Sequence, residues 1–164
     1  MSLIKHLLKK ANIERRICSP ASGEITEITK LSDDVFSQKM MGEGFFVKPE
    51  EQEICEIVSP LSGIITNIFE TKHAITIHNE EVDVLLHLGI DTVEMKGLPF
   101  DLMLRPNQSV TEGQIIAKMD VAKIVNAGKT PEIIVVFPEL SEEKWKLEKN
   151  GNVAAGEQIG KINF

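Results

Sequence analysis

The chain has 164 residues, of which 42% are hydrophobic and 26% are charged, with a formal net charge of −7 at pH 7. This balance is typical of a globular protein rather than a disordered one, and we expect one domain spanning residues 1–164. It argues against nucleic-acid binding, which needs neutralising Lys and Arg, and no apolar run approaches the ~20 residues that a membrane span requires.

The first ten residues, MSLIKHLLKK, place apolar side chains on one helical face with lysines around it. The segment is shorter than a signal peptide and lacks a small-residue cleavage site. We expect a short helix packed on the body of the protein, with weak attachment to a membrane surface as the alternative. The two cysteines, Cys18 and Cys55, predict neither a disulfide framework nor a zinc site, so the expected compartment is the cytoplasm.

Two pairs of similar segments indicate an internal duplication. Residues 19–28 (SPASGEITEI) match residues 59–68 (SPLSGIITNI), and residues 110–119 (VTEGQIIAKM) match residues 153–162 (VAAGEQIGKI). Each segment combines a glycine turn with a short run of alternating apolar residues, a pattern typical of a turn that leads into a strand. Two copies are too few for a solenoid, so a duplicated β unit is expected.

Further strands are predicted where Ile and Val dominate between turn residues, at 43–48, 53–58, 72–78, 82–88 and 132–137. Their close spacing is typical of all-β folds. We therefore expect an antiparallel β-sandwich or barrel with internal duplication and short peripheral helices. The helices are expected at 98–104, where Pro99 suits a first turn, and at 139–149.

A histidine, His87, interrupts the apolar run VLLHLGIDT at 84–92. If residues 79–81 form a three-residue loop, His87 lies directly opposite His73 on the preceding strand, and the two side chains share a face. The same register places Ile75 opposite Leu85. A register shifted by one residue would put the two histidines on opposite faces.

The alternation along the second strand supports a histidine that is not needed for packing. A complete apolar core face is formed by Val82, Val84, Leu86 and Leu88, which leaves His87 on the other face. Paired imidazoles on that face could bind a metal, act as acid and base, or form a covalent intermediate. Two unrelated structural histidines are the remaining interpretation, and the pattern alone leaves these alternatives open.

Three segments around these histidines carry specific motifs: FETKHAITI at 69–77, LLHLGIDTVEMKG at 85–97 and DDVFSQKMMGEGFFVKP at 33–49. They resemble the two active-site segments and the docking segment of the enzyme IIA component of the glucose-type sugar phosphotransferase system. The resemblance covers nearly the whole chain. It implies an antiparallel β-sandwich that accepts a phosphoryl group from the phosphohistidine of the carrier HPr. It further implies transfer to a cysteine on the IIB domain of a sugar permease, without a cofactor and without binding the sugar.

The resemblance also implies a role for each matching residue. His87 falls on the phosphorylated histidine, and His73 on the second histidine, which stabilises the phosphoryl group. Thr71 matches the hydroxyl that orients the second ring, Asp91 matches the acidic residue beside the site, and Gly89 belongs to the same supporting motif.

The partner-docking surface implied by the resemblance is an apolar ring with acidic neighbours. The ring maps to Val35, Phe36, Met40, Met41, Phe69, Ile75, Leu85 and Val93. Acidic residues that could steer a basic donor are Asp33, Asp34, Glu43 and Asp91. Two imidazoles alone make a weak metal site, so we expect no stoichiometric zinc in the isolated protein.

Two other functions compete with this interpretation. The segment VTEGQIIAKMDVAKI at 110–124 is similar to the hairpin of biotinyl and lipoyl carriers, with Lys123 at the modified lysine, although the residues flanking Lys123 match neither carrier motif. The third possibility is a purely regulatory protein that uses the same docking surface to bind permeases or kinases.

Overall fold

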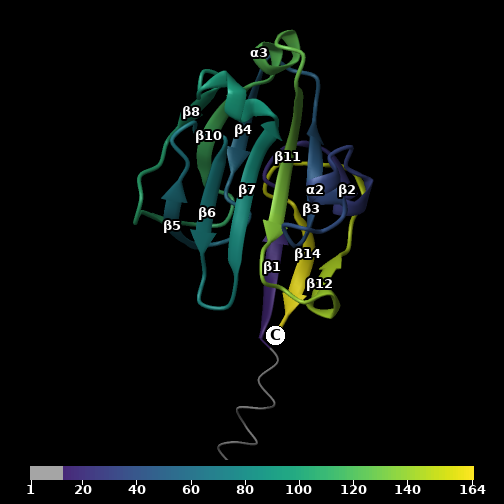
Figure 1. The fold of residues 1–164 in the computed structure, drawn as a ribbon. Helices are drawn as coiled ribbons and strands as arrows, with labels where there is room; N and C mark the ends of the chain where they lie inside the picture. Colours follow the sequence, from purple (N-terminus) through teal and green to yellow (C-terminus); the bar gives the residue numbers. More distant parts are fainter. Residues whose placement is uncertain (1–12) are drawn as a thin grey trace, which may run out of the picture.

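The computed structural model describes residues 13–164, so the helix expected in the first ten residues lies outside the described part of the chain. Regular structure in the described part is mainly antiparallel β-sheet with a few short helices (Figure 1), which confirms the predicted fold class. Within residues 13–164, no helix is both long enough and apolar enough to cross a membrane.

The elements follow one another with short connections. The strands are β1 (Glu14–Cys18), β2 (Gly23–Glu27), β3 (Glu43–Pro49), β4 (Ile54–Val58), β5 (Gly63–Ile68), β6 (Ala74–His78), β7 (Asp83–Ile90), β8 (Phe100–Leu102), β9 (Ser109–Val110), β10 (Ile115–Asp120), β11 (Thr130–Phe137), β12 (Trp145–Leu147), β13 (Gly151–Val153) and β14 (Gln158–Asn163). The α-helices are α2 (Asp34–Ser37) and α3 (Val121–Asn126), and the 3-10 helices are η1 (Ile28–Lys30), η2 (Thr92–Met95) and η3 (Glu142–Lys144). All five of the Ile- and Val-rich segments predicted to be strands are confirmed.

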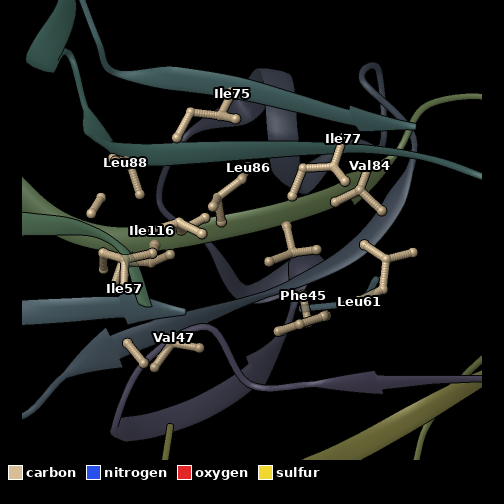
Figure 2. Packing of buried hydrophobic residues seen from close by; sticks show 14 of the residues in the cluster. Phe45, Val47, Ile57, Leu61, Ile75, Ile77, Val84, Leu86, Leu88 and Ile116 are labelled. Carbon is tan, nitrogen blue, oxygen red and sulfur yellow. The ribbon is translucent and has the colours of Figure 1, made fainter. Parts of the chain in front are cut away.

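One eight-stranded sheet, in the order β13-β2-β3-β11-β7-β6-β5-β9, dominates the structure. Two smaller three-stranded sheets, β4-β10-β8 and β1-β14-β12, make up the rest of the β-structure. The main core joins these sheets: Figure 2 shows Leu86 and Leu88 of β7 and Ile75 of β6 packed towards Ile57 of β4 and Ile116 of β10. All five side chains are fully buried, and burying an aliphatic side chain of this size contributes about 1.5–3 kcal/mol.

A second apolar cluster lies on the opposite face of the same sheet. Alternation along β7 sends Leu85 to this face and its neighbours to the main core. Phe36 of α2 and Ile28 of η1 pack onto it, so the segment containing these short helices covers part of the sheet beside β7. This arrangement brings the predicted docking segment next to His87.

Equivalent hydrogen bonds in the two halves support the predicted duplication. The hydroxyls of Ser19 and Ser59, both fully buried, donate to the carbonyl two residues further on, at 2.7 Å in each copy. The carbonyls of the same two serines accept from the amides of Gly156 and Gly113, at 2.9 Å in each copy. The Ser-Pro turn of each half therefore binds the glycine turn of the second repeated segment in the same way.

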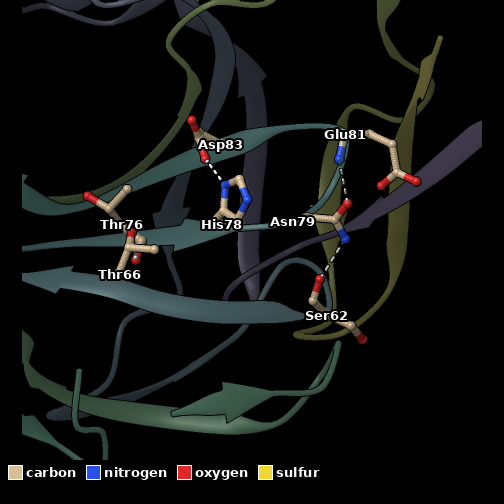
Figure 3. A network of polar contacts seen from close by, with 7 residues as sticks. All are labelled: Ser62, Thr66, Thr76, His78, Asn79, Glu81 and Asp83. Carbon is tan, nitrogen blue, oxygen red and sulfur yellow. Dashed lines mark hydrogen bonds and ion pairs between the residues drawn. The ribbon is translucent and has the colours of Figure 1, made fainter. Parts of the chain in front are cut away.

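The register of β6 and β7 differs by one residue from the prediction. Asn79 and Val82 exchange backbone hydrogen bonds, so the loop has two residues instead of three. The Asn79 side chain holds this tight turn by accepting from the amide of Glu81 at 3.1 Å. Figure 3 shows the consequence, in which His78 faces Asp83 across the strands with 2.6 Å between Nδ1 and Oδ1. Two-residue hairpin loops fit the twist of antiparallel strands well.

Both predicted peripheral helices are corrected. At 98–104 the chain forms β8, because its backbone pairs with β10. At 139–149 the helix is limited to η3, and β12 follows at once. Trp145 packs between Phe45 and Phe137, with ring centroids 5.6 and 4.8 Å away. Packing of this partly buried ring on the core and pairing with β14 therefore override the local helical pattern.

Candidate functional site

His87 lies near the end of β7, and its ring orientation is fixed by a backbone carbonyl two residues further along the chain. The Nδ1 atom is 2.8 Å from the carbonyl oxygen of Gly89. Since a carbonyl can only accept, Nδ1 carries the proton and Nε2 carries the lone pair. The turn requires glycine, because Gly89 has a φ of +79° and an added Cβ would lie 2.4 Å from Cγ2 of Thr92.

His73 is the residue before β6, so its side chain does not have to follow the alternation of faces along that strand. The residue before it, Lys72, has a left-handed φ of 59°. The Nδ1 atom of His73 lies 2.6 Å from the hydroxyl of Thr71, and its carbonyl accepts from the amide of Leu88 at 2.7 Å. The ring is therefore held at both its side chain and its backbone, and only 8% of the residue is exposed.

The two imidazoles meet edge to face although the residues are not paired across the strands. Their ring centroids are 5.2 Å apart, and Ala74 is the residue opposite His87. Phe36 packs on the outer side of His87 at 5.0 Å, and Phe69 packs on His73 at 5.4 Å. The four rings thus form a continuous row, and all four residues line a hollow of about 320 Å³.

Most residues of the expected docking surface surround this hollow. Four that line it are between 38% and 47% exposed: Val35, Met41, Phe69 and Val93. Phe36 and Leu85 line it as buried residues, at 7% and 8% exposure. Met40 is 71% exposed on the same segment but does not line the hollow.

Ile75 was expected on that surface, and this prediction is wrong. It lies opposite Leu86, is fully buried and belongs to the main core. The one-residue register shift sends its side chain to the other face of the sheet. Ala74 and Ile90 line the hollow instead, and neither was expected from the sequence. A two-residue loop at 80–81, with Asn79 as the last residue of the hairpin arm, is the signal that would have identified Ala74.

Burial keeps both imidazoles neutral. It lowers the pKa of His87 to about 4, and the adjacent ring of His73 adds to the lowering. The Gly89 carbonyl and the carboxylates of Asp33 and Asp91 oppose this shift only in part. Burial also lowers the pKa of His73. At neutral pH each ring therefore retains a lone pair, as a nucleophile requires.

The charged residues at the hollow are acidic. Asp33 and Asp91 line it, and no Lys or Arg of residues 13–164 does. One carboxylate oxygen of Asp33 also accepts from the amides of Val35 and Phe36, at 3.0 and 3.3 Å, which fixes the start of α2. Among the described residues, no three side chains of His, Cys, Asp or Glu are grouped to hold a metal ion.

This geometry suits nucleophilic chemistry at a ring nitrogen. Both Nδ1 atoms are engaged, and the described residues offer no hydrogen-bond partner to either Nε2. A neutral histidine with a free Nε2 can accept a group covalently, and a second imidazole beside it can donate a hydrogen bond to that group.

Comparison with known proteins assigns the family. A model of the phosphoenolpyruvate-dependent sugar phosphotransferase system EIIA 1 family matches residues 15–143. The chain belongs to this EIIA family. It is 36% identical over 149 residues to a glucose-specific EIIA component of Haemophilus influenzae, covering 90% of this chain and 88% of that protein.

Longer and structural relatives agree with this assignment. The glucose-specific EIICBA component of Streptococcus pneumoniae is 38% identical over 155 residues, which cover 93% of this chain and 21% of that protein. The EIIA chain thus spans about a fifth of the length of such relatives. The solved glucose permease IIA from Mycoplasma capricolum superposes with a TM-score of 0.84 at 26% identity, covering 92% of this chain and 96% of that one.

Proposed function

We propose that this EIIA protein is a phosphoryl relay in sugar uptake, with His87 as the residue that carries the phosphoryl group. The observation that supports this most strongly is the state of His87. It is a neutral imidazole with its proton held on Nδ1 by Gly89, and its Nε2 is free beside a second imidazole. The whole chain, residues 1–164, is proposed to act as one EIIA domain on the cytoplasmic side of the membrane.

Phosphoryl transfer at this site needs no proton movement on His87. The lone pair of Nε2 forms the new P–N bond while the electron pair of the donor's P–N bond returns to the imidazole of HPr. Nδ1 keeps its proton and continues to donate to Gly89. In the second transfer, a cysteine thiolate of the IIB domain forms a P–S bond, and the electron pair of the P–Nε2 bond returns to His87.

His73 is proposed to stabilise the transferred group. Its Nδ1 is occupied by Thr71 at 2.6 Å, and with the hydroxyl as donor the ring proton lies on Nε2. That N–H can donate to a phosphoryl oxygen on the neighbouring ring. Such a donor is fixed before the reaction, so it stabilises developing charge without reorganisation.

The lack of a cationic clamp supports transfer over storage. Arg binds phosphate through two parallel hydrogen bonds, and within the described part of the chain neither Arg nor Lys lines the hollow. A relay must release its phosphoryl group to the next protein, so weaker N–H donors suit it better. Phosphoryl transfer depends mainly on positioning and charge stabilisation, which the row of rings supplies.

The exposed apolar residues around the hollow are proposed as the surface for HPr and for the IIB domain. Val35 and Val93 line the hollow at 45% and 47% exposure, and Met40 on the same segment as Val35 is 71% exposed. Exposed apolar side chains grouped in this way mark interaction surfaces, whereas single ones do not. Asp33 and Asp91 at the same hollow favour a basic donor surface over nucleic acid. Regulatory targets would use the same surface, whereas the sugar itself has no role in this site.

The carrier alternative is disfavoured by the position of Lys123. This lysine lies inside α3, where its amide donates to the Asp120 carboxylate at 2.9 Å, rather than at the tip of a hairpin. Intact mass after expression with biotin and lipoate separates the two functions. We expect no added cofactor mass. Biotin or lipoate attached to Lys123 would contradict the relay proposal and favour the carrier function.

The direct test is reconstitution of the relay with purified components. Phosphoenolpyruvate, the general components of the system and HPr are incubated with this protein, and the mass of one added phosphoryl group is measured. Addition of a IIB domain should then return the protein to its unmodified mass. Failure of phospho-HPr to modify the wild-type protein would contradict the proposal.

A further inference from the structure

Thr92 is a fully buried polar residue in contact with Leu88 and Gly89, and neither the sequence motifs nor the chemistry above gives it a role. It is the first residue of η2, two residues after the end of β7. Its hydroxyl donates to the carbonyl of Leu88 at 2.5 Å. Its Cγ2 methyl packs against the α-carbon of Gly89, where an added Cβ would come within 2.4 Å.

The Leu88–Gly89 corner that Thr92 holds is hydrogen-bonded to both histidines. The amide of Leu88 donates to the carbonyl of His73 at 2.7 Å. The carbonyl of Gly89 accepts from Nδ1 of His87 at 2.8 Å. Each histidine is therefore one hydrogen bond from the corner, and Thr92 contacts both residues of that corner.

The corner needs support because its backbone is unusual. Gly89 has a φ of +79°, and two residues later Asp91 has a φ of 60°, in the left-handed region that non-glycine residues seldom adopt. The side chain of Asp91 makes no capping hydrogen bond to η2. The hydroxyl of Thr92 instead closes the turn by bonding back across four residues to Leu88.

We propose that Thr92 is a positioning residue which, through Leu88 and Gly89, keeps the proton of His87 on Nδ1 and the ring of His73 beside it. The catalytic consequence rests on the proposed phosphoryl relay, because Nε2 is nucleophilic only while the proton stays on Nδ1. If the Gly89 carbonyl turns away, the proton can move to Nε2 and block the nitrogen that attacks. The position of the proton itself does not depend on the relay.

The test uses two variants of Thr92 and one matched control. Thr92→Val removes the hydroxyl and keeps the shape, whereas Thr92→Ser keeps the hydroxyl and loses the methyl group. Ser59→Ala is the control, since it removes an equally buried hydroxyl that donates to a carbonyl at 2.7 Å in the Ser-Pro turn. The ¹⁵N chemical shifts of the His87 ring report its tautomer, and the rate of phosphoryl acceptance from HPr is measured in parallel.

We expect the wild type, Thr92→Ser and Ser59→Ala to hold the Nδ1–H tautomer and to accept phosphoryl groups at similar rates. Thr92→Val should show a mixture with the Nε2–H tautomer and a rate lowered about tenfold or more, in line with the cost of small misplacements at a reacting group. A Thr92→Val protein that matches Ser59→Ala in both measurements would overturn the role of Thr92.

Two further outcomes are decided by the same design. If Thr92→Val does not fold, Thr92→Ser carries the test, and a mixed tautomer in that variant overturns the proposal because the hydroxyl is still present. If the wild type accepts no phosphoryl group, the relay is wrong. The tautomers of the three variants then still support or overturn the positioning role by themselves.

Discussion

His73 and His87 bring their ring centroids to 5.2 Å although they are not partners across the strands. The partner of His87 is Ala74, which is fully buried in the second apolar cluster, on the face of the sheet that carries the two histidines. A small side chain at this position leaves space in which the ring of His73, from just outside β6, lies beside His87. The size of residue 74 is therefore part of the site.

Replacing Ala74 with Leu should separate the two rings. The larger side chain does not fit into the second apolar cluster without moving its neighbours, and such overpacking typically lowers the free energy of unfolding by about 1–3 kcal/mol. Ala117→Leu is the matched control, since Ala117 is also fully buried but lies in the main core on β10. We expect both variants to lose stability in urea unfolding and only Ala74→Leu to lose phosphoryl acceptance at a temperature where both are folded. Equal activity of the two variants would show that ring spacing is unimportant.

Replacing Gly89 with Ala tests the turn that holds the His87 proton. Left-handed backbone costs a non-glycine residue about 1–2 kcal/mol, and here the new methyl group also collides with Thr92. Gly113→Ala provides the control, because Gly113 has a φ of +81° with nothing within 4 Å of an added Cβ. We expect Gly89→Ala to be less stable than Gly113→Ala by about 1–3 kcal/mol on thermal or urea unfolding. Equal losses would mean that backbone strain alone makes residue 89 a glycine.

The sequence predicts the two faces of β7 and the duplication, but not the pairing of β6. Alternation places Val84, Leu86 and Leu88 together whatever the neighbouring strand does, and all three lie in the main core. The register depends on whether Asn79 belongs to the loop or to the strand, and the sequence pattern allows both. The hydrogen bond that the Asn79 side chain accepts from the amide of Glu81 stabilises the two-residue loop and thereby favours the observed register.

The site was predicted from its motifs with partly wrong geometry. A sheet in the observed register would send residue 73 to the core face, as it sends Ile75. His73 escapes this because the strand begins one residue later and Lys72 adopts a left-handed conformation. Local backbone geometry of this kind is not visible in a pattern of apolar residues.

Stability should fall with acid because of the buried histidines. The unfolded chain binds a proton at His87 near pH 6.5, whereas the folded protein binds it only near the lowered pKa of about 4. This contribution is therefore fully present above about pH 6.5 and is lost as the pH falls towards 4. Between pH 7.5 and pH 5 we expect the wild type to lose about 1–2 kcal/mol more unfolding free energy than His87→Gln. Parallel pH profiles of the two proteins in urea titrations would contradict the lowered pKa.

Partner docking should depend on the exposed apolar residues at the hollow. Val93→Ser removes an apolar side chain that is 47% exposed, and Ile115→Ser does the same at 44% exposure on β10, away from the hollow. We expect Val93→Ser to raise KM for phospho-HPr about fivefold or more, a cost of about 1 kcal/mol, with little change in kcat. Ile115→Ser should match the wild type, and equal KM values for both variants would place the docking surface elsewhere.

The most direct test of the account is labelled phosphoryl transfer from phosphoenolpyruvate, read first on this protein and then on a IIB domain, with His87→Gln and His73→Gln compared. We predict that His87→Gln takes up no label, since the attacking Nε2 is gone. His73→Gln should still accept the group from HPr, but should pass it to IIB about 10²-fold more slowly or worse, because the ring that stabilises the transferred charge is lost. Labelling of His87→Gln, or unchanged labelling and transfer in both variants, would contradict the assignment of these two histidines.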